Sequence, residues 1–401
     1  MKDLVVMGGG AAGIFAAIHA KMACPNAKVI VLEKTAVLLS KVRISGGGRC
    51  NVTHALFDPF LLVKNYPRGS KELIGPFQVF QPKDTVEWFE SRGVPLKTEP
   101  DGRMFPISDD SETIIESLLS QARKLGVEIL LRARIQNIIK TEDFFELFPK
   151  EGSKIQTRTL LLATGSSPEG YSAAESLGHS IQKPVPSLFT FNVPTSPLKE
   201  LSGIAVQNVR LKIANFVQEG PLLITHFGFS GPAALKLSAW GARYLFEKNY
   251  HVELLINWLP ALSQEAIFHL LIQFKRENPQ KPFLSENLFG LPKNLWKTFL
   301  DSLANKRSHD ISHAQLRNLA EKLHCDHYQV EGKTTNKEEF VTCGGVTLKE
   351  VNFKTMESKI CPNLFFAGEI LDIDGVTGGF NFQSAWTTGY IAGQNVLKEE
   401  L

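Results

Sequence analysis

The residues of this chain that are best suited to bind a nucleotide stand directly after its first apolar run. Residues 4–7 predict a short buried strand, and residues 8–13 read Gly-Gly-Gly-Ala-Ala-Gly, which fits the pattern G-x-G-x-x-G. Glycines let a backbone approach a pyrophosphate, and free N–H groups at the start of the next helix, predicted over 14–22, attract its charge. A second apolar run over 29–32 ends at Glu33, and an acid at this distance suits ribose hydroxyls. We therefore predict a dinucleotide site that includes Gly8, Gly10, Ala11, Ala12, Gly13 and Glu33.

Two further segments offer groups of the same kind. Residues 46–48 are three glycines followed by Arg49, and a concave backbone beside a guanidinium suits a diphosphate or a polar ring edge. A buried strand over 159–162 ends in a small turn, at the edge where ligands of parallel sheets collect. Lys34 is placed to lie over an adenine, although an exposed lysine is the simpler interpretation. The cofactor residues predicted here are Lys34, Gly47, Gly48, Arg49, Cys50, Asn51, Ala163, Thr164 and Gly165.

The C-terminal part of the chain again combines a strand, glycines and a helix. Residues 363–367 predict a strand that ends in Gly368-Glu369, and residues 379–397 predict a long helix. N–H groups at the start of such a helix stabilise negative charge on a bound ring. The cofactor residues predicted here are Gly368, Glu369, Asp374, Gly379, Phe380, Asn381, Phe382 and Gln383.

Two side chains are candidates for catalysis, and each has a simpler alternative. His226 follows an apolar run and is a candidate acid or base, but a lone histidine is more often structural. Cys50 lies inside the predicted site, and packing or cofactor contact is the alternative to a redox role. The other histidines and cysteines show neither metal spacing nor a C-x-x-C pair, so we predict no metal.

The composition is that of an ordinary globular enzyme. The chain has 401 residues, of which 43% are hydrophobic and 21% charged, and its net charge of +3 gives no reason to expect a nucleic-acid or membrane partner. It contains no run of 18 apolar residues, and five sparse cysteines fit a reducing compartment. We therefore expect a cytoplasmic protein that acts on a small molecule, with its oligomeric state left open.

Periodicity predicts an α/β fold with an insertion. Residues 1–35 indicate β-α-β, residues 36–58 an irregular segment, and residues 82–93 and 110–125 two helices. Alternating apolar segments then indicate a β-rich insertion, followed by three helices, two of them capped by Ser263 and Ser312, and by a strand over 340–346. The predicted domains are 1–186 and 346–401 for the two parts of a Rossmann-like domain, 187–260 with about 327–345 for the β-rich unit, and 261–326 for the helical unit.

Four motifs together resemble one known family. They are Ser45-Gly46-Gly47-Gly48-Arg49-Cys50-Asn51, the segment 225–232, Thr355-Met356-Glu357-Ser358-Lys359, and the segment 366–383. In this combination the chain resembles, from residue 4 to residue 397, the BaiN-like flavoproteins, which are also described as aminoacetone-oxidase-family FAD-binding proteins or NAD(P)/FAD-dependent oxidoreductases. The resemblance implies a split FAD-binding domain with an inserted β-barrel-like domain and a small helical domain. It also implies that Glu369 binds the ribityl chain of FAD.

The chain departs from the family pattern in two loops. Residues 39–44 replace a glycine and an apolar residue of the usual stretch, and residues 166–170 shorten the usual loop. These departures concern the substrate more than the fold. The function expected from the sequence is an FAD-dependent oxidoreductase acting on an unidentified small organic substrate, with NAD(P)H as one candidate reductant. The alternatives are an oxygen-using amine-type flavin oxidase, a flavin-binding sensor or partner-binding protein with little or no catalysis, and an NAD-dependent dehydrogenase without flavin.

Overall fold

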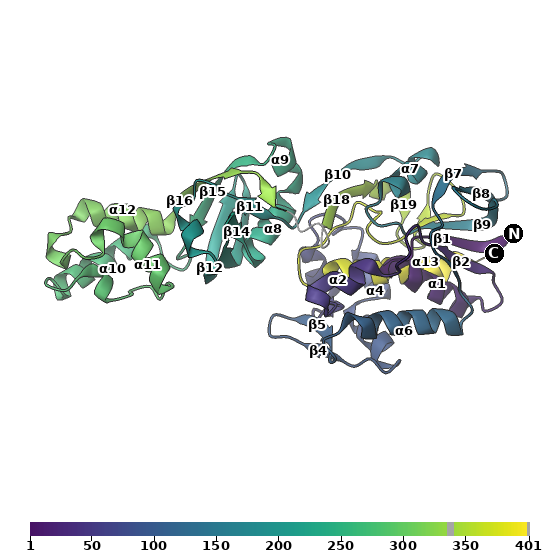
Figure 1. The fold of residues 1–401 in the computed structure, drawn as a ribbon, viewed down its shortest axis with the longest axis horizontal. Helices are drawn as coiled ribbons and strands as arrows, with labels where there is room; N and C mark the ends of the chain where they lie inside the picture. Colours follow the sequence, from purple (N-terminus) through teal and green to yellow (C-terminus); the bar gives the residue numbers. More distant parts are fainter. Residues whose placement is uncertain (335–340, 399–401) are drawn as a thin grey trace. The chain divides into compact units, whose positions relative to one another are not determined.

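The chain forms two compact units in a computed structural model that describes residues 1–334 and 341–398 (Figure 1). Unit 1 comprises Met1–Val185 and Lys337–Leu401, and unit 2 comprises Pro186–Asn336. Unit 1 is therefore built from two stretches that are far apart in the sequence. No helix within the described ranges is both long and apolar enough to span a bilayer.

Unit 1 contains a nine-stranded sheet with the order β19-β20-β21-β9-β1-β2-β6, to which β8 and then β7 are added beside β9. Strands β21, β9, β1, β2 and β6 run parallel, whereas β7, β8, β19 and β20 pair antiparallel. All four residues of β2 are buried, as expected where both faces of a parallel sheet are covered. The strands are β1 (Lys2–Met7), β2 (Val29–Leu32), β6 (Glu128–Leu130), β7 (Ile135–Lys140), β8 (Phe145–Pro149), β9 (Ile155–Leu162), β19 (Val351–Asn352), β20 (Glu357–Ser358) and β21 (Leu364–Phe366).

Two small sheets, eight α-helices and two short 3₁₀ helices complete the described part of unit 1. The small sheets are β3 (Thr53–His54) with β5 (Arg103–Pro106) and β4 (Leu96–Thr98), and β10 (Ile181–Ser187) with β18 (Val341–Val346). The helices are α1 (Ala11–Ala23), α2 (Ser40–Gly48), α3 (Pro59–Leu62), α4 (Ile74–Val79), α5 (Pro82–Glu90), α6 (Ser111–Lys124), α7 (Pro168–Ser176) and α13 (Phe380–Asn395).

Helices α1 and α13 join the two stretches of unit 1, and they lie side by side (Figure 1). A Cβ atom added at Gly389 would lie 2.7 Å from the carbonyl oxygen of Ala12, and one at Gly393 would lie 2.5 Å from that of Ala16. Real Cβ atoms do not approach so closely, so these two glycines allow the helix backbones to meet. This contact places the N-terminal glycine loop and the start of α13 in one unit.

Unit 2 is an antiparallel sheet covered by helices. The sheet has the order β16-β15-β12-β13-β14-β11-β17. One hydrophobic core contains side chains of both the sheet and the helices, including Phe229, Trp258 and Trp296. The strands are β11 (Thr190–Asn192), β12 (Ala205–Ile213), β13 (Phe216–Ile224), β14 (Gly228–Ser230), β15 (His251–Asn257), β16 (Asp326–Glu331) and β17 (Lys333–Thr334). The helices are α8 (Pro232–Trp240), α9 (Ala242–Glu247), α10 (Gln264–Glu277), α11 (Lys293–Leu300) and α12 (His313–His324).

The predicted fold class is confirmed, because a Rossmann-type parallel sheet is combined with an additional antiparallel sheet and helices. The predicted caps are also confirmed: the hydroxyls of Ser263 and Ser312 accept hydrogen bonds from the third residue of α10 and of α12. The prediction that 36–58 is irregular was wrong, because α2 begins at Ser40 and is kinked at Ser45–Gly47. The strand predicted over 340–346 is β18, which pairs with β10; Phe340 lies outside the described residues.

Candidate functional site

The glycine loop after β1 has the shape that a pyrophosphate requires. Gly8 has φ +113°, and a Cβ atom there would lie 2.3 Å from the carbonyl oxygen of Ala163. Gly10 caps α1, and a Cβ atom there would meet nothing within 4 Å, so the backbone at the helix start faces open space. Ala11, Ala12 and Gly13 form the first turn of α1, where N–H groups have no intrahelical partner. The loop therefore presents a partly accessible, partially positive helix terminus.

The acid at the end of β2 is held against this loop. Glu33 Oε2 accepts a hydrogen bond of 2.9 Å from the Gly9 N–H, and Oε1 accepts one of 2.8 Å from the Thr35 N–H. Each carboxylate oxygen keeps a second lone pair, so the geometry still permits ribose hydroxyls to donate. Lys34, in contrast, binds Glu169 at 2.9 Å; the hydrogen bond from Lys34 lowers the pKa of Glu169 to about 2. This ion pair favours the simpler interpretation of Lys34.

At the end of α2, two glycines with accessible backbone precede an arginine whose side chain already has protein partners. Gly47 and Gly48 have positive φ angles, and a Cβ atom on either would meet nothing within 4 Å. The Arg49 guanidinium binds Glu99 at 2.7 Å and lies 4.1 Å from the centre of the Phe105 ring. The sequence pattern therefore located the exposed backbone, whereas the arginine already has a carboxylate partner.

Cys50 and Asn51 are turned into the protein. Cys50 is fully buried, and this burial raises the pKa of its thiol to about 12, so the thiolate that redox chemistry needs is disfavoured. When its amide is oriented to satisfy both neighbours, Asn51 accepts a hydrogen bond of 2.9 Å from the Gly379 N–H and donates one of 3.0 Å to the Thr53 carbonyl. Asn51 thus ties the segment after α2 to the start of α13.

The turns after β9 and β21 lie next to the glycine loop. The Ala163 N–H donates to the Met7 carbonyl at 2.8 Å, and the Thr164 side chain follows directly. Gly165 and Gly368 both have positive φ angles. A Cβ atom on Gly368 would lie 2.8 Å from that of Ala12, so this turn packs on the first turn of α1. Three strand ends that were predicted separately therefore meet at the carboxyl edge of one sheet.

Glu369 is surrounded by polar groups that lack partners. Its carboxylate accepts from Lys41 and, at 3.2 Å, from the Thr342 N–H. The hydroxyls of Thr164, Tyr171 and Thr342 are buried and have no hydrogen-bond partner in the described structure. Burial, and then the charge of Glu369, raises the pKa of Tyr171, so its hydroxyl stays protonated and can donate. Leaving each such group unpaired costs about 1–3 kcal/mol, which a bound polar ligand would recover.

Tyr171 and Thr342 were not predicted as site residues. Each stands inside a regular element, Tyr171 in the middle of α7 and Thr342 as the second residue of β18. The signals in the sequence were the neighbouring glycines, Gly170 before Tyr171 and Gly344-Gly345 after Thr342, and the shortened loop 166–170 that Tyr171 follows. Their position at Glu369 depends on how α7, β18 and the turn after β21 meet.

The side chains at the start of α13 are occupied by protein partners. Phe380 stacks on the His54 ring with centroids 4.7 Å apart, and Phe382 stacks on Trp386. Asn381 exchanges two hydrogen bonds with the backbone of Gly375, and buried Gln383 accepts from Thr53 and Thr85. These side chains fix the start of α13. Because they already have protein partners, a ligand would bind the backbone N–H groups there.

Asp374 is also engaged. It is fully buried and forms an ion pair with the Arg68 guanidinium through both carboxylate oxygens. This pairing closes the loop before α13 and accounts for the burial of the carboxylate.

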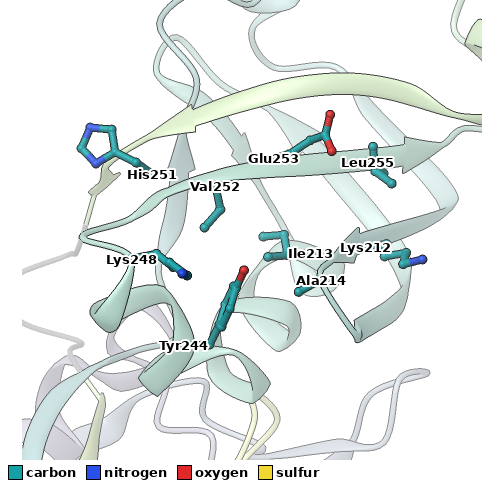
Figure 2. Close-up of a pocket in the computed structure, with 9 residues that line it drawn as sticks. All are labelled: Lys212, Ile213, Ala214, Tyr244, Lys248, His251, Val252, Glu253 and Leu255. Atoms are coloured by element: carbon teal, nitrogen blue, oxygen red, sulfur yellow. The ribbon is translucent and has the colours of Figure 1, made fainter.

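His226 belongs to unit 2, in the turn between β13 and β14, whereas the other predicted site residues belong to unit 1. Nearby, Gly231 caps α8, and Ser230 Oγ lies 2.9 Å from Thr190 Oγ1. Unit 2 also contains a pocket of about 470 Å³ that includes no predicted residue; Figure 2 shows its lining, which is Lys212, Ile213, Ala214, Tyr244, Lys248, His251, Val252, Glu253 and Leu255. Across the described ranges, no group of three or more His, Cys, Asp or Glu side chains could hold a metal ion.

Comparisons with characterised proteins give relatives that match along almost the whole chain. A ribosomal RNA dihydrouridine synthase of Haemophilus influenzae is 29% identical over 416 residues and covers 99% of both chains. The protein of the same name from Escherichia coli is 28% identical, with 98% of both chains covered. A 3-dehydro-bile acid delta(4,6)-reductase of Clostridium scindens is 27% identical, again with 98% of both chains covered.

Solved structures support the fold. The 3-ketosteroid-delta4-(5alpha)-dehydrogenase of Rhodococcus jostii matches with a TM-score of 0.53 at 16% identity, over 99% of this chain and 97% of that one. A flavocytochrome c3 fumarate reductase in its open conformation matches with the same TM-score and identity, over 99% of this chain and 78% of that one. The HI0933-like protein Rossmann domain matches residues 2–395. The chain therefore belongs to the HI0933-like family of Rossmann-type flavoproteins, in agreement with the resemblance that its motifs carry.

Proposed function

We propose that this protein is an FAD-dependent oxidoreductase that reduces a carbon–carbon double bond conjugated to a carbonyl group. The observation that carries the proposal is the meeting of the glycine loop, the turn at Gly368-Glu369 and the start of α13 in unit 1. The FAD would supply transfer of hydride or of single electrons. The protein would bind FAD, orient it and exclude water from it.

The residues present fit FAD at its phosphates, its ribose, its ribityl chain and its ring. Open space at Gly10, Gly47 and Gly48 leaves backbone accessible to phosphate oxygens, and Glu33 is placed to accept ribose hydroxyls rather than a 2′-phosphate. Around Glu369, the unpaired hydroxyls of Thr342 and Tyr171 match the several hydroxyls of a ribityl chain. The backbone N–H groups at the start of α13 would face developing negative charge on the ring.

The class of substrate follows from the names of the relatives. A delta(4,6)-reductase of a 3-dehydro-bile acid and a dihydrouridine synthase both saturate a ring double bond that is conjugated to a carbonyl. Such a bond accepts hydride at its β-carbon and a proton at its α-carbon. We propose a small organic substrate of this kind, because the net charge of +3 gives little electrostatic attraction to RNA.

NAD(P)H is the reductant that we propose. The sequence contains one strand–G-x-G-x-x-G–helix unit, which FAD would occupy, so a pyridine nucleotide would visit transiently rather than bind in a second Rossmann unit. An oxygen-using amine oxidase is the second candidate, since the same flavin site would serve either direction of electron flow.

Anaerobic reduction of the purified holoprotein tests this proposal. The protein should be yellow and release FAD on denaturation, and NADH or NADPH should bleach it. Adding 2-cyclohexenone, a steroid 4-en-3-one or a uridine-containing ribosomal RNA fragment in parallel should restore the colour only with a true acceptor. Bleaching by small amines, and not by NAD(P)H, would favour the oxidase; release of FMN alone would contradict the role of Glu33.

A further inference from the structure

Unit 2 carries a thiol, an imidazole and a carboxylate in a hydrogen-bonded row. Cys325 Sγ lies 3.7 Å from His327 Nε2, and His327 Nδ1 lies 2.8 Å from Glu253 Oε1. A carboxylate only accepts hydrogen bonds, so Nδ1 carries the proton and Nε2 is left to accept one from the thiol. This is the order of groups in which an imidazole activates a nucleophile.

The local structure brings the three side chains together. Cys325 follows the last residue of α12, and β16 begins at the next residue. Side chains two residues apart in a strand share a face, so Cys325 and His327 project on the same side. Leu255 of β15 pairs directly with His327, and Glu253 stands two residues along on the same face.

Among the cysteines, Cys325 differs in its surroundings. Cys50, Cys343 and Cys361 are buried, whereas Cys24 and Cys325 are partly exposed. The Cys24 thiol lies 3.9 Å from the carbonyl oxygen of Leu397 and has no imidazole partner among residues 1–334 and 341–398. Cys24 therefore provides an internal reference for a thiol of intermediate exposure without a base.

A cavity adjoins this row. Glu253 and Leu255 belong to the lining of the pocket of about 470 Å³ in unit 2, and Figure 2 shows them as neighbours along one strand, with Lys212 beside Leu255. This volume lies within the range of about 300–1,000 Å³ that small-molecule sites occupy. Neither Cys325 nor His327 is among the lining residues, so the pocket borders the row only through Glu253 and through Leu255, the residue that pairs with His327.

We propose that Cys325, His327 and Glu253 form a site of covalent modification by α,β-unsaturated carbonyl compounds. The thiol gives its proton to His327 Nε2 while its sulfur forms a bond to the β-carbon of the ligand. The π electron pair moves to the carbonyl oxygen, and the resulting enolate takes the proton from His327 at its α-carbon. Glu253 stabilises the transient imidazolium. The addition consumes no oxidant or reductant and needs no flavin.

The charges around Cys325 make this reaction depend on His327. Burial and the carboxylates of Glu253, Asp326 and Glu321 raise the pKa of the Cys325 thiol, and Lys212 opposes them. Little thiolate is present at neutral pH, so a base must remove the proton during the attack. Labelling of Cys325 should therefore proceed at pH 7, and His327→Gln should shift its rise to alkaline pH.

Competitive labelling tests the site. The oxidised holoprotein is treated with limiting N-ethylmaleimide, an α,β-unsaturated carbonyl compound, and the adducts on Cys325 and Cys24 are quantified by peptide mass spectrometry. We expect Cys325 to react at least about tenfold faster than Cys24, a modest part of the 10²–10⁴ that positioned bases provide in enzymes. His327→Gln should bring the two rates together, whereas His269→Gln on the exposed face of α10 should leave the ratio unchanged.

Two results would overturn the proposal. The first is that Cys325 reacts no faster than Cys24. The second is that the ratio of the two labelling rates is unchanged in a His327→Gln variant whose thermal unfolding matches that of the unsubstituted protein. Glu253→Gln separates orientation from simple electrostatics. If Glu253 acts only through its charge, Glu253→Gln should lower the pKa of the Cys325 thiol and accelerate labelling. If Glu253 orients and stabilises His327, the same substitution should slow labelling of Cys325 at pH 7. Faster labelling would exclude Glu253 from the site. None of these readouts depends on the flavin reaction, so the two proposals can fail separately.

Discussion

At the residue scale, the Thr342 hydroxyl distinguishes a cofactor site from ordinary packing. It is buried and unpaired beside Glu369, so Thr342→Val should leave the flavin-free protein as stable or slightly more stable. With FAD bound, the same change should remove a hydrogen bond worth about 1 kcal/mol and weaken FAD retention about fivefold. Flavin fluorescence during dialysis measures retention. Thr298→Val, at a partly exposed position of α11, is the control, and equal retention in both variants would contradict the assignment.

His19 should make the protein sensitive to acid. Both ring nitrogens are buried without a partner, and burial, with the charge of Arg92, lowers the pKa of His19 to about 3. The unfolded chain takes up this proton below pH 6.5, so the contribution of His19 is present above pH 6.5 and lost as the pH falls towards 3. Between pH 7.5 and 5 this loss is about 2 kcal/mol.

His19→Leu, which nearly preserves volume and places a better helix former in α1, should remove this loss of stability on acidification. The measurement is the free energy of unfolding in urea at pH 7.5 and at pH 5 for the two proteins. At pH 7.5 the variant should be at least as stable, because it removes two unpaired polar atoms. An equal loss of stability on acidification in both proteins would show that His19 is not the group responsible.

At the element scale, the packing of α13 on α1 depends on its glycines. Gly389→Ala raises helix propensity by about 1 kcal/mol, but its Cβ would lie 2.7 Å from the Ala12 carbonyl oxygen. Overpacking of this kind costs about 1–3 kcal/mol, so the variant should be less stable and should retain less FAD. Gly75→Ala in α4, where a Cβ would meet nothing within 4 Å, is the matched control and should be neutral or stabilising. Urea unfolding and flavin release measure both, and an unchanged Gly389→Ala would contradict the close contact.

The elements that the sequence predicts well are those with an uninterrupted pattern. Helices α6, α10 and α12 have a regular apolar face, and the helix starts at Ser263 and Ser312 were marked by their caps. Strand β9 begins at Ile155, before the apolar run 159–162 that predicts it, because Arg158 interrupts the apolar pattern but is exposed in the folded strand. Helix α2 was missed because its glycines indicate a loop, whereas its first turn is an ordinary helix.

The sequence predicted the backbone positions of the site better than the interactions of its side chains. A positive φ and a need for space are properties of one residue, so Gly8, Gly47 and Gly379 could be identified from sequence. Whether a charged or amide side chain is free to bind a ligand depends on its neighbours in the folded structure, and these neighbours are distant in the sequence. Arg68, for example, is 306 residues from Asp374, so its ion pair could not be predicted from the motif.

At the scale of the whole molecule, the two units should respond differently to the cofactor. The predicted cofactor residues lie in unit 1, and unit 2 has a hydrophobic core of its own. A ligand at 100 times its Kd stabilises the folded state that binds it by about 2.7 kcal/mol. Hydrogen–deuterium exchange of α1 and α13 should therefore be about 100-fold slower with FAD than without it, at amides that exchange by opening of unit 1.

The peptides of α10 and α12 provide the internal control for this measurement. They belong to unit 2, and their exchange should change by less than about twofold when FAD is removed, because the free energy of binding is linked only to the unit that holds the ligand. Slowing restricted to residues 1–35 would mean that the C-terminal segment does not take part in binding, and uniform slowing in both units would mean that they unfold as one. The first pattern would contradict a flavin held jointly by the two stretches of unit 1, on which the proposed oxidoreductase activity depends, whereas the second would contradict only the independent unfolding of the two units.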